Sequence, residues 1–344
     1  MSVRGILILG ILTLVVLTLA LVLVSPSVDE RNGEPRPLVP GLHEIVNEID
    51  AIDITAADGA ALVSLRRDRE RWRVSEKAGY EADFELVHDL LRDLATGRRV
   101  DERTSNPQWY ARLGLLDMGQ QGATGTMISF PQRDLPAIIL GHEDSNQQGQ
   151  FVRLADDEQT WLSDRIVSLP DSAVGFLERA IMDIPASELS EVTVRHPDGN
   201  TIRLRSTEQE DSDDWVLLDV PDGRNAKPMW ELRQVANGLA NLNLDDVRTH
   251  EQIPEGAVRV LYVTRDGLNF VASLFKDDQG PWIHFSVSAE TDAVTDDDDA
   301  EVSEIAIDAA AVDARLSPWQ YRIPERKFNT MTRRFEDLLQ PLED

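Results

Sequence analysis

Six histidines are the side chains of this sequence best suited to acid–base or metal chemistry. They are His43, His88, His142, His196, His250 and His284. Two imidazoles that share one metal are commonly signalled by a short spacing such as H-E-x-x-H or H-x-H, and neither spacing occurs here. We therefore expect no metal ligands in this chain.

Residues 119–125 are rich in glycine and could be compared with a phosphate-binding loop. Such a loop joins a strand to a helix and carries a lysine followed by serine or threonine, which reaches the phosphates. This segment lacks both features, so we interpret it as an ordinary loop. The chain also has no cysteine and no G-x-S-x-G nucleophile elbow. We expect neither a catalytic residue nor a cofactor-binding residue.

Carboxylates and tryptophans leave two further interpretations open. Residues 296–299 are consecutive aspartates that could gather Ca²⁺, but they lack the alternating ligands and turn glycine of a calcium loop. With 62 Asp and Glu residues, a carboxylate pair of the glycosidase kind would arise by chance, and nothing distinguishes one pair. The seven tryptophans could form a carbohydrate platform, although their recurrence in two halves of the chain favours a structural role.

The overall charge excludes one class of partner. Against 62 acidic residues stand only 34 Lys and Arg, which gives a net charge of −28 and a pI near 4.5. Such a chain repels the phosphate backbones of nucleic acids. We expect no nucleic-acid partner.

The chain begins with an apolar segment long enough to cross a membrane. Residues 6–24 extend from Ile6 to Val24 without a charge, and about 20 apolar residues span a hydrocarbon core of about 30 Å. Arg4 in residues 1–5 favours a cytoplasmic N-terminus. A cleaved signal peptide is the alternative, but its apolar stretch is usually shorter and ends in small residues. The segment predicts an uncleaved, single-pass anchor.

The rest of the chain divides by composition. Residues 25–41 are rich in proline and are typical of an extended linker. The remaining chain of about 300 residues is long enough for two domains. We assign a first module to residues 42–184 and a second to residues 185–344. Without cysteine, the modules must be stabilised by their own cores and not by disulfides.

An internal repeat supports two modules. In each copy, alternating apolar residues lead to an Asp-Gly pair and then alternate again, which predicts a β-hairpin, and a later tryptophan marks a third strand. The landmarks of the repeat are Asp58, Gly59 and Trp72 in the first copy and Asp198, Gly199 and Trp215 in the second. We expect structural roles for all of them.

Each hairpin is followed by a helical period and then by further alternating segments. The predicted helices cover residues 82–94 and residues 229–242, the second with Pro228 in its first turn. The expected fold is therefore α+β, with two similar β-β-β-α-β-β-β modules of mostly antiparallel sheet. Residues 288–311 are expected to form a solvated acidic loop of the second module. Residues 328–339 are expected to form a C-terminal helix.

These features resemble the domain of unknown function 4340 family. The patterns are I-x-I-x-x-x-D-G, a basic strand, W-x-V and A-D-x-x-x-V-x-x-L-L-x-x-L. The matching residues are Ile52, Ile54, Asp58, Gly59, Arg66, Trp72, Val74, Ala82, Asp83, Val87, Leu90, Leu91 and Leu94. The second copy departs from the pattern, with Ala226-Lys227-Pro228 in place of the Ala-Asp pair. The resemblance implies a bacterial envelope protein, often encoded beside gliding-motility-type ABC transporters, and no catalytic residue.

Together these observations predict a non-catalytic accessory or scaffold subunit of an ABC-type transport system. It would be anchored in the bacterial inner membrane through residues 6–24, with a cytoplasmic N-terminus and a periplasmic body. Its expected partners are the membrane and protein subunits of the transport complex, and no cofactor is expected. The alternative is an envelope glycan-binding protein or hydrolase that uses a cleft between the two modules.

Overall fold

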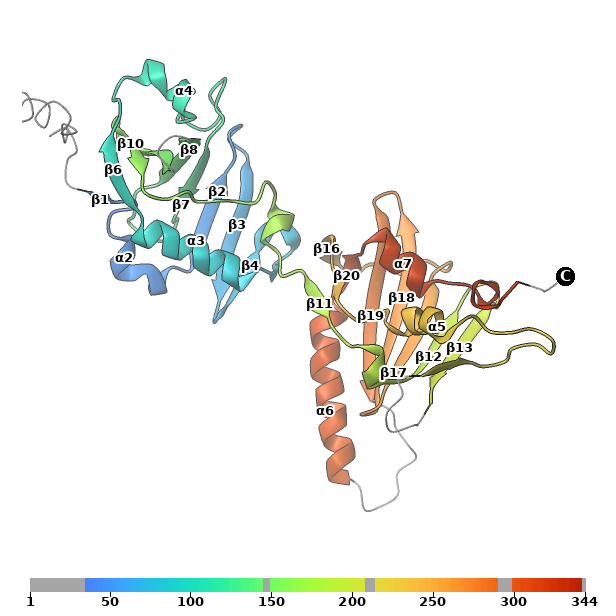
Figure 1. The fold of residues 1–344 in the computed structure, drawn as a ribbon. Coiled ribbons are helices and arrows are strands. Elements are labelled where there is room, and N and C mark those ends of the chain that lie inside the picture. The colour runs from blue at the N-terminus through green and yellow to red at the C-terminus, as the bar shows by residue number, and fades with distance from the viewer. Residues whose placement is uncertain (1–34, 145–148, 208–213, 290–298, 342–344) are drawn as a thin grey trace, which may run out of the picture. The chain divides into compact units, whose positions relative to one another are not determined.

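A computed structural model describes residues 35–144, 149–207, 214–289 and 299–341, with only the backbone for residues 299–305 (Figure 1). The predicted anchor and most of the linker lie outside these residues. Within them, no helix is both long enough and apolar enough to span a bilayer. The fold is α+β with antiparallel sheets, which confirms the predicted class.

Contacts between Cα atoms divide the chain into two compact units. One contains the residues up to 48 together with residues 54–60 and 90–168, and the other contains residues 49–53, 61–89 and 169–344. The division passes through the first sheet and does not fall at one point in the sequence.

The first sheet has ten strands in the order β1-β6-β10-β9-β8-β7-β2-β3-β4-β5. In chain order the strands are β1 (Arg36–Pro37), β2 (Ala51–Thr55), β3 (Ala61–Asp68), β4 (Arg71–Val74), β5 (Tyr80–Glu81), β6 (Arg98–Glu102), β7 (Thr126–Ser129), β8 (Ile138–Asp144), β9 (Gly149–Leu154) and β10 (Thr160–Ser163). Ile52 and Ile54 of β2 and Val63 and Leu65 of β3 are fully buried. The predicted alternation thus places one side of each strand in the core.

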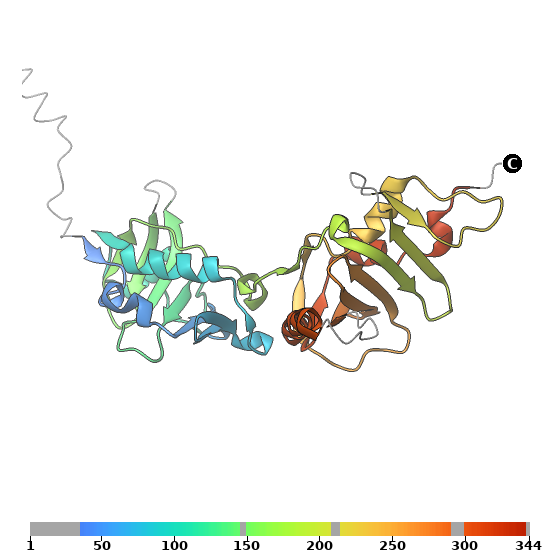
Figure 2. The same cartoon turned by 90° about the horizontal axis from the view of Figure 1, so that it is seen from below.

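Helix α3 (Phe84–Thr96) lies across one face of this sheet (Figure 2). It begins after Asp83, whose carboxylate accepts a hydrogen bond of 3.0 Å from the backbone N–H of Leu86 and so satisfies a free donor of the first turn. Val87 and Leu94 are fully buried against the sheet. The smaller helices of this region are α2 (Leu42–Ile45), α4 (Tyr110–Leu113) and the 3-10 turns η1 (Val46–Glu48), η2 (Ser75–Lys77), η3 (Pro107–Trp109) and η4 (Ala173–Phe176).

The second large sheet has eight strands in the order β14-β13-β12-β17-β18-β19-β20-β16, and a separate pair joins β11 to β15. In chain order the strands are β11 (Ala180–Met182), β12 (Leu189–Arg195), β13 (Thr201–Ser206), β14 (Trp215–Leu217), β15 (Leu242–Asn243), β16 (Asp246–Thr249), β17 (Val258–Thr264), β18 (Leu268–Asp277), β19 (Gly280–Ala289) and β20 (Trp319–Arg322). Tyr262, Trp282, Phe285 and Tyr321 are buried in its core.

The two large sheets share one strand order. Eight strands of the first sheet run β4-β3-β2-β7-β8-β9-β10-β6, and each strand of the second sheet carries a number greater by ten. Each sheet receives three of these strands before its helix and five after it, two more than the predicted module. In each large sheet the first strand after the helix, β6 or β16, was not predicted.

Three helices accompany the second sheet: α5 (Met229–Ala236), α6 (Asp299–Leu316) and α7 (Glu325–Met331), with 3-10 turns η5 (Ala186–Glu188) and η6 (Phe335–Leu338). The prediction of a loop over residues 288–311 is wrong for residues 299–311, which belong to α6. Alanine recurs through this segment, and alanine has the highest helix propensity. The acidic residues 290–298 lie outside the described chain.

The predicted C-terminal helix, residues 328–339, is two elements. Helix α7 ends at Met331, and the turn η6 begins at Phe335. Thr332 ends α7, with its hydroxyl donating 2.8 Å to the Phe328 carbonyl. The carboxylate of Asp337 accepts from the backbone N–H of Arg334 at 2.9 Å and starts the second turn. Local side-chain hydrogen bonds therefore interrupt the helical period.

Candidate binding site

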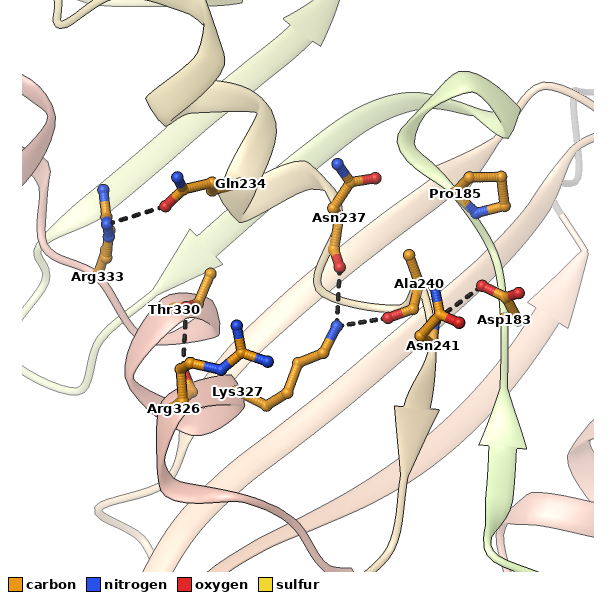
Figure 3. A pocket seen from close by; sticks show the side chains of 10 residues that line it. All are labelled: Asp183, Pro185, Gln234, Asn237, Ala240, Asn241, Arg326, Lys327, Thr330 and Arg333. Carbon is orange, nitrogen blue, oxygen red and sulfur yellow. Dashed lines mark hydrogen bonds between the residues drawn. The ribbon is translucent and has the colours of Figure 1, made fainter.

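A pocket of the second unit has a volume of about 840 Å³. It lies between the end of α5, helix α7 and the segment that joins β11 to η5 (Figure 3). The residues that line it are Asp183, Pro185, Gln234, Asn237, Ala240, Asn241, Arg326, Lys327, Thr330 and Arg333. They come from three separate parts of the sequence, which the fold brings together.

Lys327 holds one wall of the pocket in place. Its ammonium group donates hydrogen bonds to the carbonyl oxygens of Asn237 (3.1 Å), Gly238 (3.2 Å) and Ala240. These carbonyls belong to the end of α5 and the turn after it, where the helix itself supplies no donors. Burial, and then the like charge of Arg326, lower the pKa of Lys327, while Asp183 opposes the shift. The charge of Lys327 is thus used mainly to cap α5.

Two more side chains fix the backbone of the same wall. The Asp183 carboxylate accepts a 2.7 Å hydrogen bond from the N–H of Asn241, a residue held in the left-handed region at φ 47°. The side-chain oxygen of Asn237 accepts from the N–H of Ala186 at 2.9 Å. Asp183 and Asn237 therefore tie the loop after α5 to the segment before β12.

Two arginines also line the pocket, and their guanidinium groups make fewer hydrogen bonds within the protein than the ammonium group of Lys327 does. Arg333 donates to the side-chain oxygen of Gln234 at 3.3 Å and lies 3.4 Å from the carboxylate of Glu231. Glu231 also pairs with Lys227 at 3.0 Å, so two cations share one carboxylate. Arg326 is exposed, and no acidic side chain of the described residues forms an ion pair with it.

The lining is positively charged although the chain carries a net charge of −28. Its ionisable groups are three cations and one carboxylate, and its other polar side chains are the amides of Gln234, Asn237 and Asn241 and the hydroxyl of Thr330. Thr330 donates to the Arg326 carbonyl at 2.9 Å, so its hydroxyl is already engaged. The pocket offers hydrogen-bond donors and positive charge, which suits recognition of a polar or anionic group.

A smaller pocket of about 400 Å³ occupies the corresponding place in the first unit. It is lined by Pro37, Val39, Gly41, His43, Glu44, Ala95, Thr96, Gly97 and Arg98. The smaller pocket lies at the C-terminal end of α3, beside the short strand β1. The larger pocket lies at the C-terminal end of α5, beside the short strand β11. The larger pocket has an additional wall, formed by α7, which supplies Arg326 and Lys327. The smaller pocket has no such wall.

The sequence model described as Domain of unknown function (DUF4340) matches residues 72–257. The chain belongs to this family. No curated protein and no solved structure matches it. The DUF4340 match includes the α5 wall of the larger pocket with Gln234, Asn237 and Asn241, and it ends before α7. Arg326, Lys327 and Arg333 therefore lie outside the matched residues.

The landmarks predicted from the repeat lie in turns and cores of this DUF4340 protein. Their side chains do not line either pocket. Asp58 accepts from the N–H of Ala60 at 2.9 Å, and Asp198 accepts from the N–H of Asn200 at 3.1 Å. The glycine that follows each aspartate has a positive φ, 87° for Gly59 and 89° for Gly199. Trp72 and Trp215 are 4 % and 2 % exposed.

Histidine contacts were not foreseen from the sequence. His142 places its Nε2 2.9 Å from the Thr124 hydroxyl and its Nδ1 3.3 Å from the Arg112 carbonyl. Both His142 and Thr124 are exposed. His250 and His284 are neighbours in the second unit. Across the described parts of the chain, no group of three His, Asp or Glu side chains is arranged to hold a metal ion.

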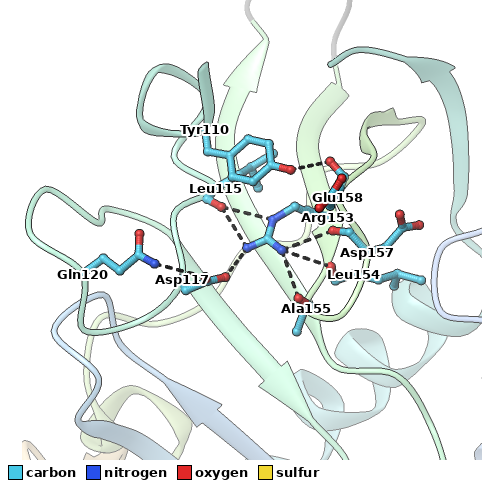
Figure 4. A network of polar contacts seen from close by, with 9 residues as sticks. All are labelled: Tyr110, Leu115, Asp117, Gln120, Arg153, Leu154, Ala155, Asp157 and Glu158. Carbon is cyan, nitrogen blue, oxygen red and sulfur yellow. Dashed lines mark hydrogen bonds and ion pairs between the residues drawn. The ribbon is translucent and has the colours of Figure 1, made fainter. Parts of the chain in front are cut away.

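A buried arginine organises the loops of the first unit (Figure 4). Arg153 of β9 is 4 % exposed, and its guanidinium donates to the carbonyls of Leu115, Leu154, Ala155 and Asp157 at 3.0–3.4 Å. It also forms an ion pair with Asp117 and packs 4.9 Å from the ring centroid of Tyr110. The hydrogen-bond donors of the Arg153 guanidinium are thus used within the protein, so Arg153 has a structural role.

Proposed function

We propose that this DUF4340 protein is a non-catalytic, membrane-anchored envelope protein that serves as an accessory or scaffold subunit of an ABC-type transport system. The larger pocket is the observation that carries the proposal. Lys327 and Asp183 hydrogen-bond to the backbone of its walls, whereas Arg326 is exposed in its lining and Arg333 adds a second guanidinium group, which contacts Gln234 (Figure 3). This arrangement suits the binding of a partner.

The N-terminal sequence supports a membrane location for this binding activity. Residues 6–24 would cross the bacterial inner membrane, with residues 1–5 in the cytoplasm and the body in the periplasm. The predicted linker, residues 25–41, is too long at its C-terminal end, because Arg36 and Pro37 pair with β6 as strand β1 and Leu38 and Val39 are buried. Residues 25–35 could still reach roughly 35 Å if extended. A tethered body of this kind is suited to holding a partner close to the membrane.

Duplication supports the scaffold role. The common strand order agrees with two copies of one module, assigned to residues 42–184 and 185–344. Only the second copy adds the cationic wall of α7 to its pocket. We infer that the first copy is chiefly a structural spacer and that the second engages the partner.

Affinity purification of the tagged full-length protein from detergent-solubilised membranes, followed by partner identification, tests the proposal. We expect the ATPase and permease subunits of a transporter to be enriched. The same preparation should not turn over glycan, peptide or ester substrates. Turnover that disappears when one specific Asp or Glu is substituted would overturn the proposal and favour the envelope hydrolase.

A further inference from the structure

We infer that the pocket beside α7 binds an acidic peptide segment of a partner protein, with Arg326 and Arg333 contacting its carboxylates. This inference rests on the proposed scaffold function and names the chemistry by which the scaffold would recognise its partner.

Positive charge that acidic side chains do not fully neutralise favours an acidic ligand in this pocket. Arg326 forms no ion pair with an acidic side chain of the described residues, and Arg333 shares Glu231 with Lys227. Asp183, the carboxylate of the lining, is bound to the N–H of Asn241. A guanidinium group can bind a carboxylate through two parallel hydrogen bonds, which makes a carboxylate ligand well matched to this wall.

The opposite wall favours a peptide over a small inorganic anion. It presents the side-chain amides of Gln234, Asn237 and Asn241 (Figure 3). The side-chain oxygens of Gln234 and Asn237 already accept from Arg333 and from the N–H of Ala186, so their NH₂ groups are left to donate to the C=O groups of a peptide backbone. The volume of about 840 Å³ is also far larger than one small anion requires.

The corresponding pocket of the first unit gives an internal comparison. It has about half the volume, and its charged residues include both Glu44 and Arg98. It has no wall that corresponds to α7. The additional cations of the second unit are therefore not a necessary part of the common fold, which supports a separate role for them.

The strong negative charge of the chain does not prevent this binding. At physiological ionic strength the Debye length is about 8 Å, so exposed carboxylates farther away are largely screened. A ligand inside the pocket instead feels the guanidinium groups in direct contact.

Fluorescence anisotropy with a labelled hexaglutamate peptide tests the inference on the full-length protein in detergent. We expect saturable binding that an unlabelled hexaglutamate peptide displaces and that a hexaglutamine peptide does not. Arg326→Gln, and the double variant Arg326→Gln/Arg333→Gln, should weaken binding, the double variant by at least tenfold. The matched control Arg195→Gln/Arg205→Gln removes two exposed arginines of the same unit that do not line the pocket, and it should bind as the original protein does.

Equal binding by the double variant and the control, or displacement by hexaglutamine, would overturn the inference. Displacement by inorganic phosphate as effective as by hexaglutamate would also overturn it, in favour of a simple anion site. Because Arg326 is exposed, the single variant keeps the test valid even if the loss of Arg333 affects folding. Failure of hexaglutamate to bind while transporter subunits still co-purify would refute this inference and leave the scaffold function. Peptide binding without co-purifying subunits would refute the scaffold function alone.

Discussion

The imidazole rings of His250 and His284 lie with their centroids 4.0 Å apart and their planes inclined by 32°. His284 is 8 % exposed on β19, and its Nε2 lies 3.1 Å from the Ser317 carbonyl. Burial first, and then the neighbouring His250, lower the pKa of His284 below 6.5, while the Ser317 carbonyl and the Asp313 carboxylate oppose the shift. The folded protein thus favours neutral His284.

This pair predicts a loss of stability on acidification. The unfolded chain takes up a proton near pH 6.5 that folded His284 resists, so the free energy of unfolding should fall as the pH drops from 6.5 through the folded pKa. Urea unfolding at pH 8, 6 and 5 measures this effect. His250→Gln should reduce the fall, and exposed His43→Gln should not. Identical pH profiles for His284→Gln and the original protein would contradict the prediction.

Asp277 predicts a second pH effect at lower pH. Burial would raise the pKa of Asp277, but hydrogen bonds from the Gln279 N–H, the Trp282 indole (2.8 Å) and Arg248 (2.9 Å) together lower it below 3.8. The resulting stability is present above about pH 4 and is lost as the pH falls through the folded pKa.

Asp277→Asn should therefore cost about 1–3 kcal/mol of unfolding free energy at pH 7, because buried donors lose their charged acceptor. The difference from the original protein should shrink at pH 3. Urea unfolding at both pH values provides the measurement, with exposed Asp278→Asn as the control. A cost that does not change with pH would show that the Asp277 charge is unimportant.

Removal of Arg153 should destabilise the first unit. Arg153→Met leaves the carbonyls of Leu115, Ala155 and Asp157 without their donor, and we expect a cost of about 1–3 kcal/mol for each carbonyl that stays buried and unpaired. Arg153→Lys should recover little of the lost free energy of unfolding, since an ammonium group cannot reproduce the planar set of donors of a guanidinium group. Chemical unfolding followed by circular dichroism, with exposed Arg112→Met as control, measures the effect. Full rescue by lysine would contradict the geometric argument.

The hairpin glycines should tolerate β-carbons poorly. Gly59→Val and Gly199→Val should each cost about 1–2 kcal/mol, because both glycines have positive φ. A β-carbon at Gly59 would also lie 3.4 Å from the backbone of Gly119, whereas one at Gly199 meets nothing within 4 Å. We therefore expect the larger loss of melting temperature for Gly59→Val. Unchanged melting temperatures of both variants would refute the claim that positive φ restricts these two positions to glycine.

The anchor prediction concerns the mature N-terminus. If residues 6–24 form an uncleaved span, the purified protein should begin at Met1 or Ser2 and should remain in the membrane fraction at high salt. Leu14→Arg should impair insertion, because an arginine at the helix centre costs about 2.5–3.5 kcal/mol. A protein sequence that starts after Ser25 would instead show cleavage.

Local patterns predicted the parts of the fold that local chemistry determines. Alternation around Asp-Gly placed the hairpins of β2 with β3 and β12 with β13, and the period of α3 was visible in its apolar residues. Strand β6 was missed because its sequence, Arg-Arg-Val-Asp-Glu, has no apolar alternation. Its pairing with β1 and β10 stabilises it, and residues distant in the sequence supply those partners.

The pocket could not be predicted for the same reason. Its residues extend from Asp183 to Arg333, and all except Pro185 and Ala240 are ordinary polar side chains without a recognisable motif. The basic pairs Arg326-Lys327 and Arg333-Arg334 were the available signal, since they stand close together in a strongly acidic chain. Only the packing of α7 beside the end of α5 turns that signal into a site.

The ends of the two large sheets bear on how the protein resists aggregation. The first sheet ends in the two-residue strands β1 and β5, and the second ends in β14, with three residues, and β16, with four. A foreign strand that docks on a sheet edge needs a row of unpaired backbone groups, and these edges offer very few. The protein therefore presents a poor template for fibril growth, even when many copies are crowded together.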